Sequence, residues 1–170
     1  MKSTTKIFAL TIAMIAISIS TFAQVSATAT TSATVITPIA ITKTVDMNFG
    51  SIAVSPTIAG TVVLAPAGTR TKTGGVTLPA VTGTVTAASF NVTGLGTSTY
   101  SISLPSTITL TGTPSGSMTV GTFLSTPSGT GTLTAGAQTV LVGGTLNVGA
   151  AQAAGSYTNS SDMTVTVNYN

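Results

Sequence analysis

Apolar and polar residues alternate along much of the chain, so that every second side chain is apolar over several stretches. The pattern is clearest near the two ends, over residues 35–49 and over residues 163–169. In the first stretch only Thr37 and Lys43 interrupt the apolar parity. A period of two is typical of a strand that packs one face against a core. Both stretches are therefore predicted to be integral strands.

Eight further short strands are expected between these ends, separated by clusters of Gly, Pro and Ser. They lie near residues 61–64, 75–78, 88–92, 99–104, 107–111, 117–123, 131–134 and 139–148. The abundant Thr and Val are β-branched and favour a pleated, half-buried surface over a helix. Turn signals at this spacing predict an all-β fold, either an antiparallel sandwich or a closed antiparallel sheet. The only candidate for a helical turn is residues 149–154.

The parity of the strands also predicts which side chains form the core. The expected core is Val35, Ile39, Ile41, Phe49, Phe90, Val92, Tyr100, Ile102, Leu104, Leu146, Val165, Val167 and Tyr169. Most of the six aromatic residues after residue 24 fall on the apolar parity and should be buried: Phe49, Phe90, Tyr100, Phe123, Tyr157 and Tyr169.

The first 33 residues differ from the rest. Residues 1–23 combine Lys2 and Lys6, an apolar stretch over 7–19 and a small-residue cleavage site ending at Ala23, which predicts a secretory signal peptide. Residues 24–33 alternate Ala or Val with Ser or Thr and contain no bulky side chain. We interpret them as a flexible extension, and residues 34–170 as a single domain. After signal cleavage no membrane span is expected, and the protein should lie in the periplasm, at the cell surface or outside the cell by the Sec route.

Composition and charge exclude many activities. The chain has 38 Thr, two acidic residues, five basic residues, and no His, Cys or Trp. Without Cys there is no disulfide or thiolate metal site, and without His the usual proton shuttle and commonest metal ligand are missing. Signal cleavage would leave a net charge of about +1, so no basic surface for binding nucleic acid is expected. No small-molecule ligand can be identified.

The candidate chemistry is sparse. Asp46 and Asp162 are the two carboxylates, and each lies beside a strand end, where structural turn or edge bonding is the expected role. Residues 68–75 hold Arg70 and Lys72, but they lack the order of a phosphate-binding loop and are predicted to form a solvated hairpin loop. A minority interpretation makes this loop a contact site for an anionic glycan or surface polymer. We predict no catalytic, cofactor-binding or metal site, and hence no enzyme.

Several stretches, taken in order, resemble one bacterial family. They are residues 33–43, 46–50, 60–68, 75–76, 88–94, 100–105 and 142–148, then 153–157 with Gly155-Ser-Tyr157, and the terminal Val165-Thr-Val-Asn-Tyr169. Together they are similar to the exported domain-of-unknown-function family 4402 (DUF4402). More distantly, they resemble spore coat protein U and Mat/Ecp fimbrial subunits.

The resemblance implies an immunoglobulin-like, pilin-like β-sandwich outside the cytoplasm, with no catalytic residues to carry over. The chain departs from many relatives after Tyr157. Residues 158–162 stand where those relatives have a short Gly-bounded turn, so the register of the expected final hairpin stays open.

Two function classes follow. The first is a non-enzymatic structural or adhesive surface protein, of the kind found in a fimbria-like subunit that assembles by β-strand addition. Its partners would be further copies or other surface subunits, bound through strand edges. The alternative is a carbohydrate- or matrix-binding β-sandwich module, which would ordinarily use exposed aromatic side chains.

Overall fold

The computed structural model describes residues 24–170, and the expected signal peptide at residues 1–23 lies outside them. The chain divides into two units between Val35 and Ile36. Residues 24–35 form no strand, and their side chains are exposed. Over residues 24–170 no helix is long and apolar enough to cross a membrane.

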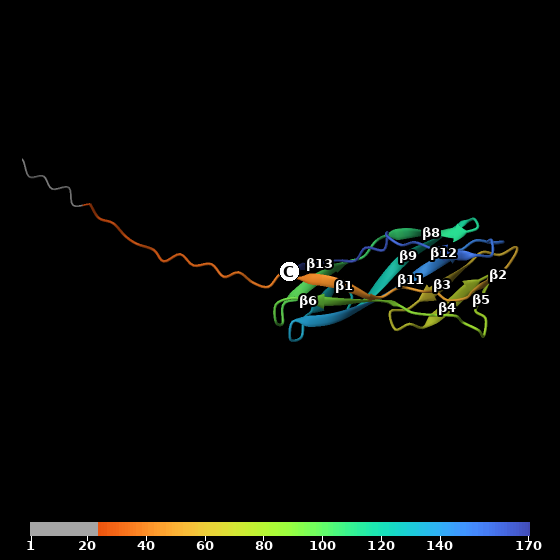
Figure 1. Cartoon of the computed structure of the whole chain (residues 1–170), viewed down its shortest axis with the longest axis horizontal. Coiled ribbons are helices and arrows are strands. Elements are labelled where there is room, and N and C mark those ends of the chain that lie inside the picture. The colour runs from red at the N-terminus through yellow and green to blue at the C-terminus, as the bar shows by residue number, and fades with distance from the viewer. Residues whose placement is uncertain (1–23) are drawn as a thin grey trace, which may run out of the picture. The chain divides into compact units, whose positions relative to one another are not determined.

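The unit Ile36–Asn170 is all-β with antiparallel pairing, which confirms the predicted class. Its strands are β1 (Ala40–Val45), β2 (Ala53–Val54), β3 (Gly60–Leu64), β4 (Arg70–Gly74), β5 (Val76–Thr77), β6 (Ala88–Thr93), β7 (Thr99–Ser103), β8 (Thr107–Thr113), β9 (Ser117–Thr126), β10 (Thr130–Thr132), β11 (Ala137–Val148), β12 (Ser156–Thr158) and β13 (Thr166–Tyr169). Figure 1 shows β1, β6 and β13 near one end of this unit, and β2, β4 and β5 near the other.

The strands form one large sheet and two small ones. The large sheet has the order β1-β6-β11-β9-β8-β12, with β3 and β4 beside the second half of β11. The small sheets are β10-β7-β13 and β2-β5. Strand β11 organises the large sheet, because its first half pairs with β6, its second half pairs with β3, and β9 runs along its other edge.

The change of partner along β11 takes place at Gly143. The register with β9 shifts between Gly143 and Thr145. A Cβ atom at Gly143 would collide with the main chain at Leu64 and Ala65, where β3 ends. A glycine lets the two backbones approach this closely, so this position allows one strand to serve two neighbours.

The buried apolar residues form two clusters. The first contains Ala88, Phe90, Val92, Tyr100, Ile102, Leu133, Val140, Val142, Val165 and Val167. The second contains Phe49, Val62, Leu64, Val76, Ile108, Met118, Val120, Leu146 and Val148. Met47, Phe123 and Met163 are partly buried and pack against both clusters, so they join the two halves of the core.

Most of the predicted core is confirmed. Phe49, Phe90, Val92, Tyr100, Ile102, Leu146, Val165 and Val167 are buried. Ile39, Ile41, Leu104 and Tyr169 are partly buried against the first cluster. The prediction that Val35 belongs to the core is wrong, since 97% of its surface is exposed. The alternation extends past the point where a partner is available: pairing starts at Ala40, opposite Thr93, after the break at Pro38.

The segment with Arg70 and Lys72 also needs correction. It was expected to be a solvated hairpin loop, but Arg70–Gly74 is strand β4, paired along its whole length with β3. The turn is shorter and earlier, closed by hydrogen bonds from Gly68 N to Ala65 O (2.8 Å) and from Ala65 N to Thr69 O (2.9 Å). A paired edge strand can carry cations and Thr because most of its side chains face solvent.

The C-terminal region is not a final hairpin. Strand β12 pairs with β8 in the large sheet, whereas β13 pairs with β7 in the three-stranded sheet. Residues 159–165 therefore cross from one sheet to the other. Residues 149–154 form turns and bends, not a helical turn.

Candidate functional site

A groove of about 890 Å³ opens in the folded unit between two segments that are far apart in the sequence. Residues 43–52 line one wall, and residues 155–161 with Met163 line the other. Its floor is apolar and draws on both core clusters: Ala88, Phe90, Ile108, Leu110, Met118, Val120 and Leu146. The groove thus lies where the two halves of the core meet.

The first wall is paired along only one edge. Strand β1 pairs with β6, and Asn48 continues this side through main-chain hydrogen bonds with Thr86 (2.8 and 3.0 Å). Successive residues of an extended chain direct their main-chain groups to opposite sides. Accordingly, the N–H and C=O of Met47 hydrogen-bond to no other residue in the described part of the chain. This wall therefore keeps unpaired main-chain groups at Met47.

Arg70 holds the first wall in place. Its Nη1 donates to the carbonyl oxygens of Phe49 and of Ser51, the latter at 3.1 Å. The side chain reaches from β4, so it ties the edge strand of the large sheet to the groove wall. The sequence interpretation of Arg70 as a loop cation or glycan contact missed this structural role. Lys72, two residues along the same strand, is exposed.

The second wall is stabilised by Asn159. Its Nδ2 donates to the carbonyl oxygen of Thr109 (2.8 Å) and to Asp162 Oδ2 (2.7 Å). Its Oδ1 accepts from the main-chain N–H groups of Ser161 (3.1 Å) and Asp162 (2.8 Å). These bonds fold the connection after β12 into an Asx-type turn fixed to β8.

Both carboxylates lie at the groove, and each is engaged by its own neighbours. Asp46 lines the groove and forms an exposed ion pair with Lys43 (2.5 Å). Asp162 stands between the lining residues Ser161 and Met163. Hydrogen bonds from the Asn159 amide and then the Ser161 hydroxyl lower the pKa of Asp162. A lowered pKa keeps a carboxyl ionised, which suits a structural anion better than a proton donor.

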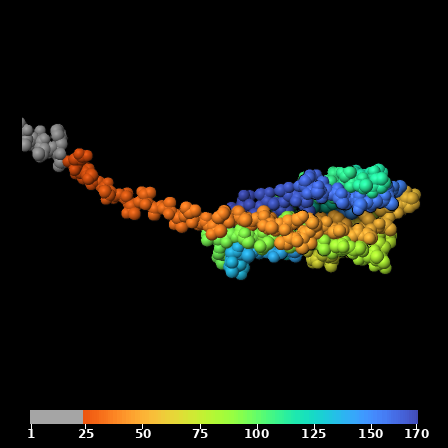
Figure 2. Space-filling model, in the orientation of Figure 1, coloured from red at the N-terminus to blue at the C-terminus, as the bar shows by residue number. Residues whose placement is uncertain are grey.

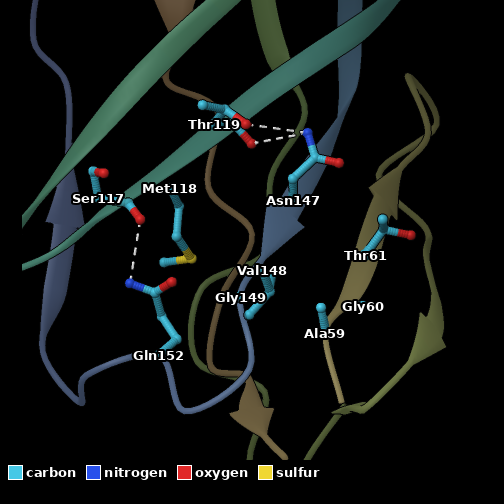
Figure 3. Close-up of a pocket in the computed structure, with 10 residues that line it drawn as sticks. All are labelled: Ala59, Gly60, Thr61, Ser117, Met118, Thr119, Asn147, Val148, Gly149 and Gln152. Atoms are coloured by element: carbon cyan, nitrogen blue, oxygen red, sulfur yellow. Dashed lines mark hydrogen bonds between the residues drawn. The ribbon is translucent and has the colours of Figure 1, made fainter. Parts of the chain in front are cut away.

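A second hollow, of about 570 Å³, is lined by polar and apolar residues at or beside the ends of β3, β9 and β11 (Figure 3). Asn147 Nδ2 donates to Thr119 Oγ1 (3.2 Å), and Gln152 Nε2 donates to the carbonyl oxygen of Ser117 (3.2 Å). Both amides are thus already bonded within the chain. None of the described residues that line this hollow is aromatic, and sugar binding ordinarily uses aromatic rings for stacking.

The aromatic side chains follow the predicted pattern in part. Phe49, Phe90 and Tyr100 are buried, whereas Phe123, Tyr157 and Tyr169 are half-buried. Their hydroxyls are used internally: Tyr100 Oη donates to Gln138 Oε1 (2.7 Å), and Tyr157 Oη to the carbonyl oxygen of Ala153 (2.7 Å). Burial raises the pKa of Tyr100.

The groove itself was not predicted from the sequence. Its walls come from segments more than 100 residues apart, and it exists because no strand pairs between them. Periodicity identifies strands but not the gaps between strands. The one local signal is that Met47 and Met163 continue the apolar parity beyond the residues that form ladders.

Comparison with known proteins identifies one relationship. The family model described as Domain of unknown function (DUF4402) matches residues 39–169, most of the chain and nearly all of the folded unit. No curated protein and no solved structure matches the chain.

Proposed function

The chain belongs to the DUF4402 family, and we propose that it is an exported, non-enzymatic structural or adhesive surface protein that assembles through its strand edges. In this proposal it acts as a fimbria-like subunit. The proposal includes the finer fold type, an immunoglobulin-like or pilin-like sandwich, and the distant similarity to spore coat protein U and fimbrial subunits.

The observation that carries the proposal is the pair of open edges at β1 and β13. These strands contact each other, yet within residues 24–170 β1 pairs only with β6, and β13 only with β7. Figure 2 shows the C-terminal residues, in blue, on the same face of the folded unit as the orange residues after Ile36. An unpaired edge presents a row of main-chain donors and acceptors that can bind another strand.

The side chains of β1 do little to protect its edge. Its sequence is Ala-Ile-Thr-Lys-Thr-Val, and Lys43 is its single charged residue. Natural sheets often block exposed edges with several charges, prolines or bulges. The only irregularity here is a register shift between Lys43 and Val45. The edge is therefore chemically suited to strand addition.

Two measurements test the proposal. The full chain, expressed in a bacterium, should be exported and cleaved to a product whose mass places Gln24 at its N-terminus. The mature protein should then form oligomers whose mass grows with concentration in light scattering, and producing cells should show surface filaments in negative stain. A mature protein that remains monomeric at high concentration, from cells without filaments, would contradict the proposal.

A further inference from the structure

We propose that residues 24–36 of a second copy bind as an added strand in the groove between residues 43–52 and residues 155–163. This inference rests on the proposed function and names the donor segment and the acceptor site. It joins two features of the chain that are otherwise unused: an exposed segment with a strand-like pattern, and a groove whose first wall has unpaired main-chain groups at Met47.

The acceptor offers both kinds of contact that an added strand requires. Met47 presents unpaired main-chain groups along the first wall. Below it, the floor contains Phe90, Met118 and Leu146, which are buried but still line the groove. Main-chain hydrogen bonds give affinity in strand addition, and contacts of alternate side chains give specificity.

The donor has the complementary pattern. Val25, Ala27, Ala29, Ala33 and Val35 share one parity, and Ser or Thr residues occupy most of the other. Val25 is 92% exposed and Val35 is 97% exposed, so these apolar side chains have no contact that buries them. The small alanines between them suit a groove whose floor is already filled by Met and Phe side chains. An added strand would place this parity on the floor and the hydroxyls toward solvent.

The length and the charge of residues 24–36 also fit the groove. At about 3.3 Å per residue, thirteen extended residues span about 43 Å, more than the roughly 33 Å that the ten residues of the first wall would span. Residues 24–36 contain no charged side chain, so burying them takes no charge out of water. At the mouth, Lys43 and Asp46 already neutralise each other.

The chain's own turn chemistry favours a second copy as the donor. A segment that folded back along β1 would need a tight reversal near residues 36–38, and two-residue hairpin turns depend on Gly, Asn or Asp. None of these occurs between residues 24 and 45. In addition, Pro38 favours an extended conformation at Thr37, whose carbonyl oxygen accepts a hydrogen bond from Tyr169 Oη (2.9 Å).

Disulfide cross-linking tests the proposal, because the chain has no Cys of its own. One mature chain carries Ala29→Cys in the donor, and another carries Ser160→Cys on the second wall. Ser160 is exposed, lines the groove and forms no hydrogen bond with any other described residue. Mixed under mild oxidation, the two should form a heterodimer with a disulfide between these positions. The control partner carries Thr97→Cys, an exposed site outside the groove, and should give at least tenfold less product.

The outcomes separate this inference from the proposed function. Two results would show that the groove is not the acceptor site but would leave the proposed assembly through strand edges intact. One is equal cross-linking to Ser160→Cys and to Thr97→Cys. The other is no cross-linking to either while the protein still oligomerises. A double variant, Ala29→Cys with Ser160→Cys, that closes within single chains at any dilution would show that the occupant is the chain's own extension and would overturn the second copy. A protein that neither oligomerises nor cross-links would overturn both proposals.

Discussion

The hydroxyl of Tyr169, the penultimate residue, donates a hydrogen bond to the carbonyl oxygen of Thr37 at 2.9 Å, just before the first strand. The hydroxyl oxygen of Tyr169 in turn accepts a hydrogen bond from the N–H of Leu95 at 2.6 Å. One side chain on β13 therefore fixes both the start of the folded unit and the loop after β6. It sets the point from which residues 24–36 leave the sandwich.

Replacing Tyr169 with Phe should lower the free energy of unfolding by about 1–2 kcal/mol, since two hydrogen bonds are lost while the ring remains. Urea unfolding measures the change. Asn170→Ala, at the adjacent exposed residue, serves as the control and should stay within about 0.5 kcal/mol of the parent. Parent-like stability in Tyr169→Phe would mean that this hydroxyl does not anchor the two segments.

Truncating Phe90 to Ala should cost about 3–5 kcal/mol, because the ring is buried in the first cluster and its loss leaves a cavity. That is a large share of the ~5–15 kcal/mol that stabilises a typical domain. Leu124→Ala is the control, since Leu124 is 54% exposed. Thermal melts of the two variants should differ clearly. If Phe90→Ala melts with the parent, the parity assigned to β6 is wrong.

Arg70 and Lys72 form a matched pair on β4. Arg70→Ala removes the donor that holds the Phe49 and Ser51 carbonyls, so it should destabilise the protein by about 1–2 kcal/mol. Lys72→Ala should change stability by less than about 0.5 kcal/mol because that side chain is exposed. The two variants are compared by their midpoints of denaturant unfolding. Equal effects of the two substitutions would show that Arg70 acts only through its charge.

Asp162 should make stability depend on pH in acid. Its pKa in the folded protein is lowered by hydrogen bonds from Asn159 and Ser161. The stabilisation is therefore fully present above the ordinary Asp pKa of about 3.9 and is lost as the pH falls through the lower, folded value. Urea midpoints from pH 6 to pH 2 should fall less steeply for Asp162→Asn than for the parent. Identical slopes would contradict this role.

The sequence predicted the parts of the fold that depend on local alternation. Phe90, Val92 and Val167 are buried because their parity is right and a partner strand is present. Val35 has the same parity but no partner, and β4 was missed because its exposed cations and threonines resemble a loop. The groove depends on which strands fail to pair across the sandwich. That information is not contained in any local window of sequence.

The extension and the last strand should behave in opposite ways when they are removed. Residues 24–33 are exposed and form no strand, so their loss should leave folding unchanged. Deleting residues 165–170 removes Val165, Val167 and Tyr169 from the first core cluster and should cause misfolding. Circular dichroism and solubility distinguish these outcomes. A C-terminal deletion that folds as well as the N-terminal one would refute the role assigned to β13.

The most direct test of assembly through a lent strand is light scattering of the mature protein and of the variant lacking residues 24–33, across a range of concentrations. The account predicts that the intact protein grows in mass with concentration. The deletion variant should fold with the same thermal midpoint and remain monomeric, and adding a synthetic peptide of residues 24–36 to the intact protein should reduce its assembly. A deletion variant that assembles as readily as the intact protein would contradict the account.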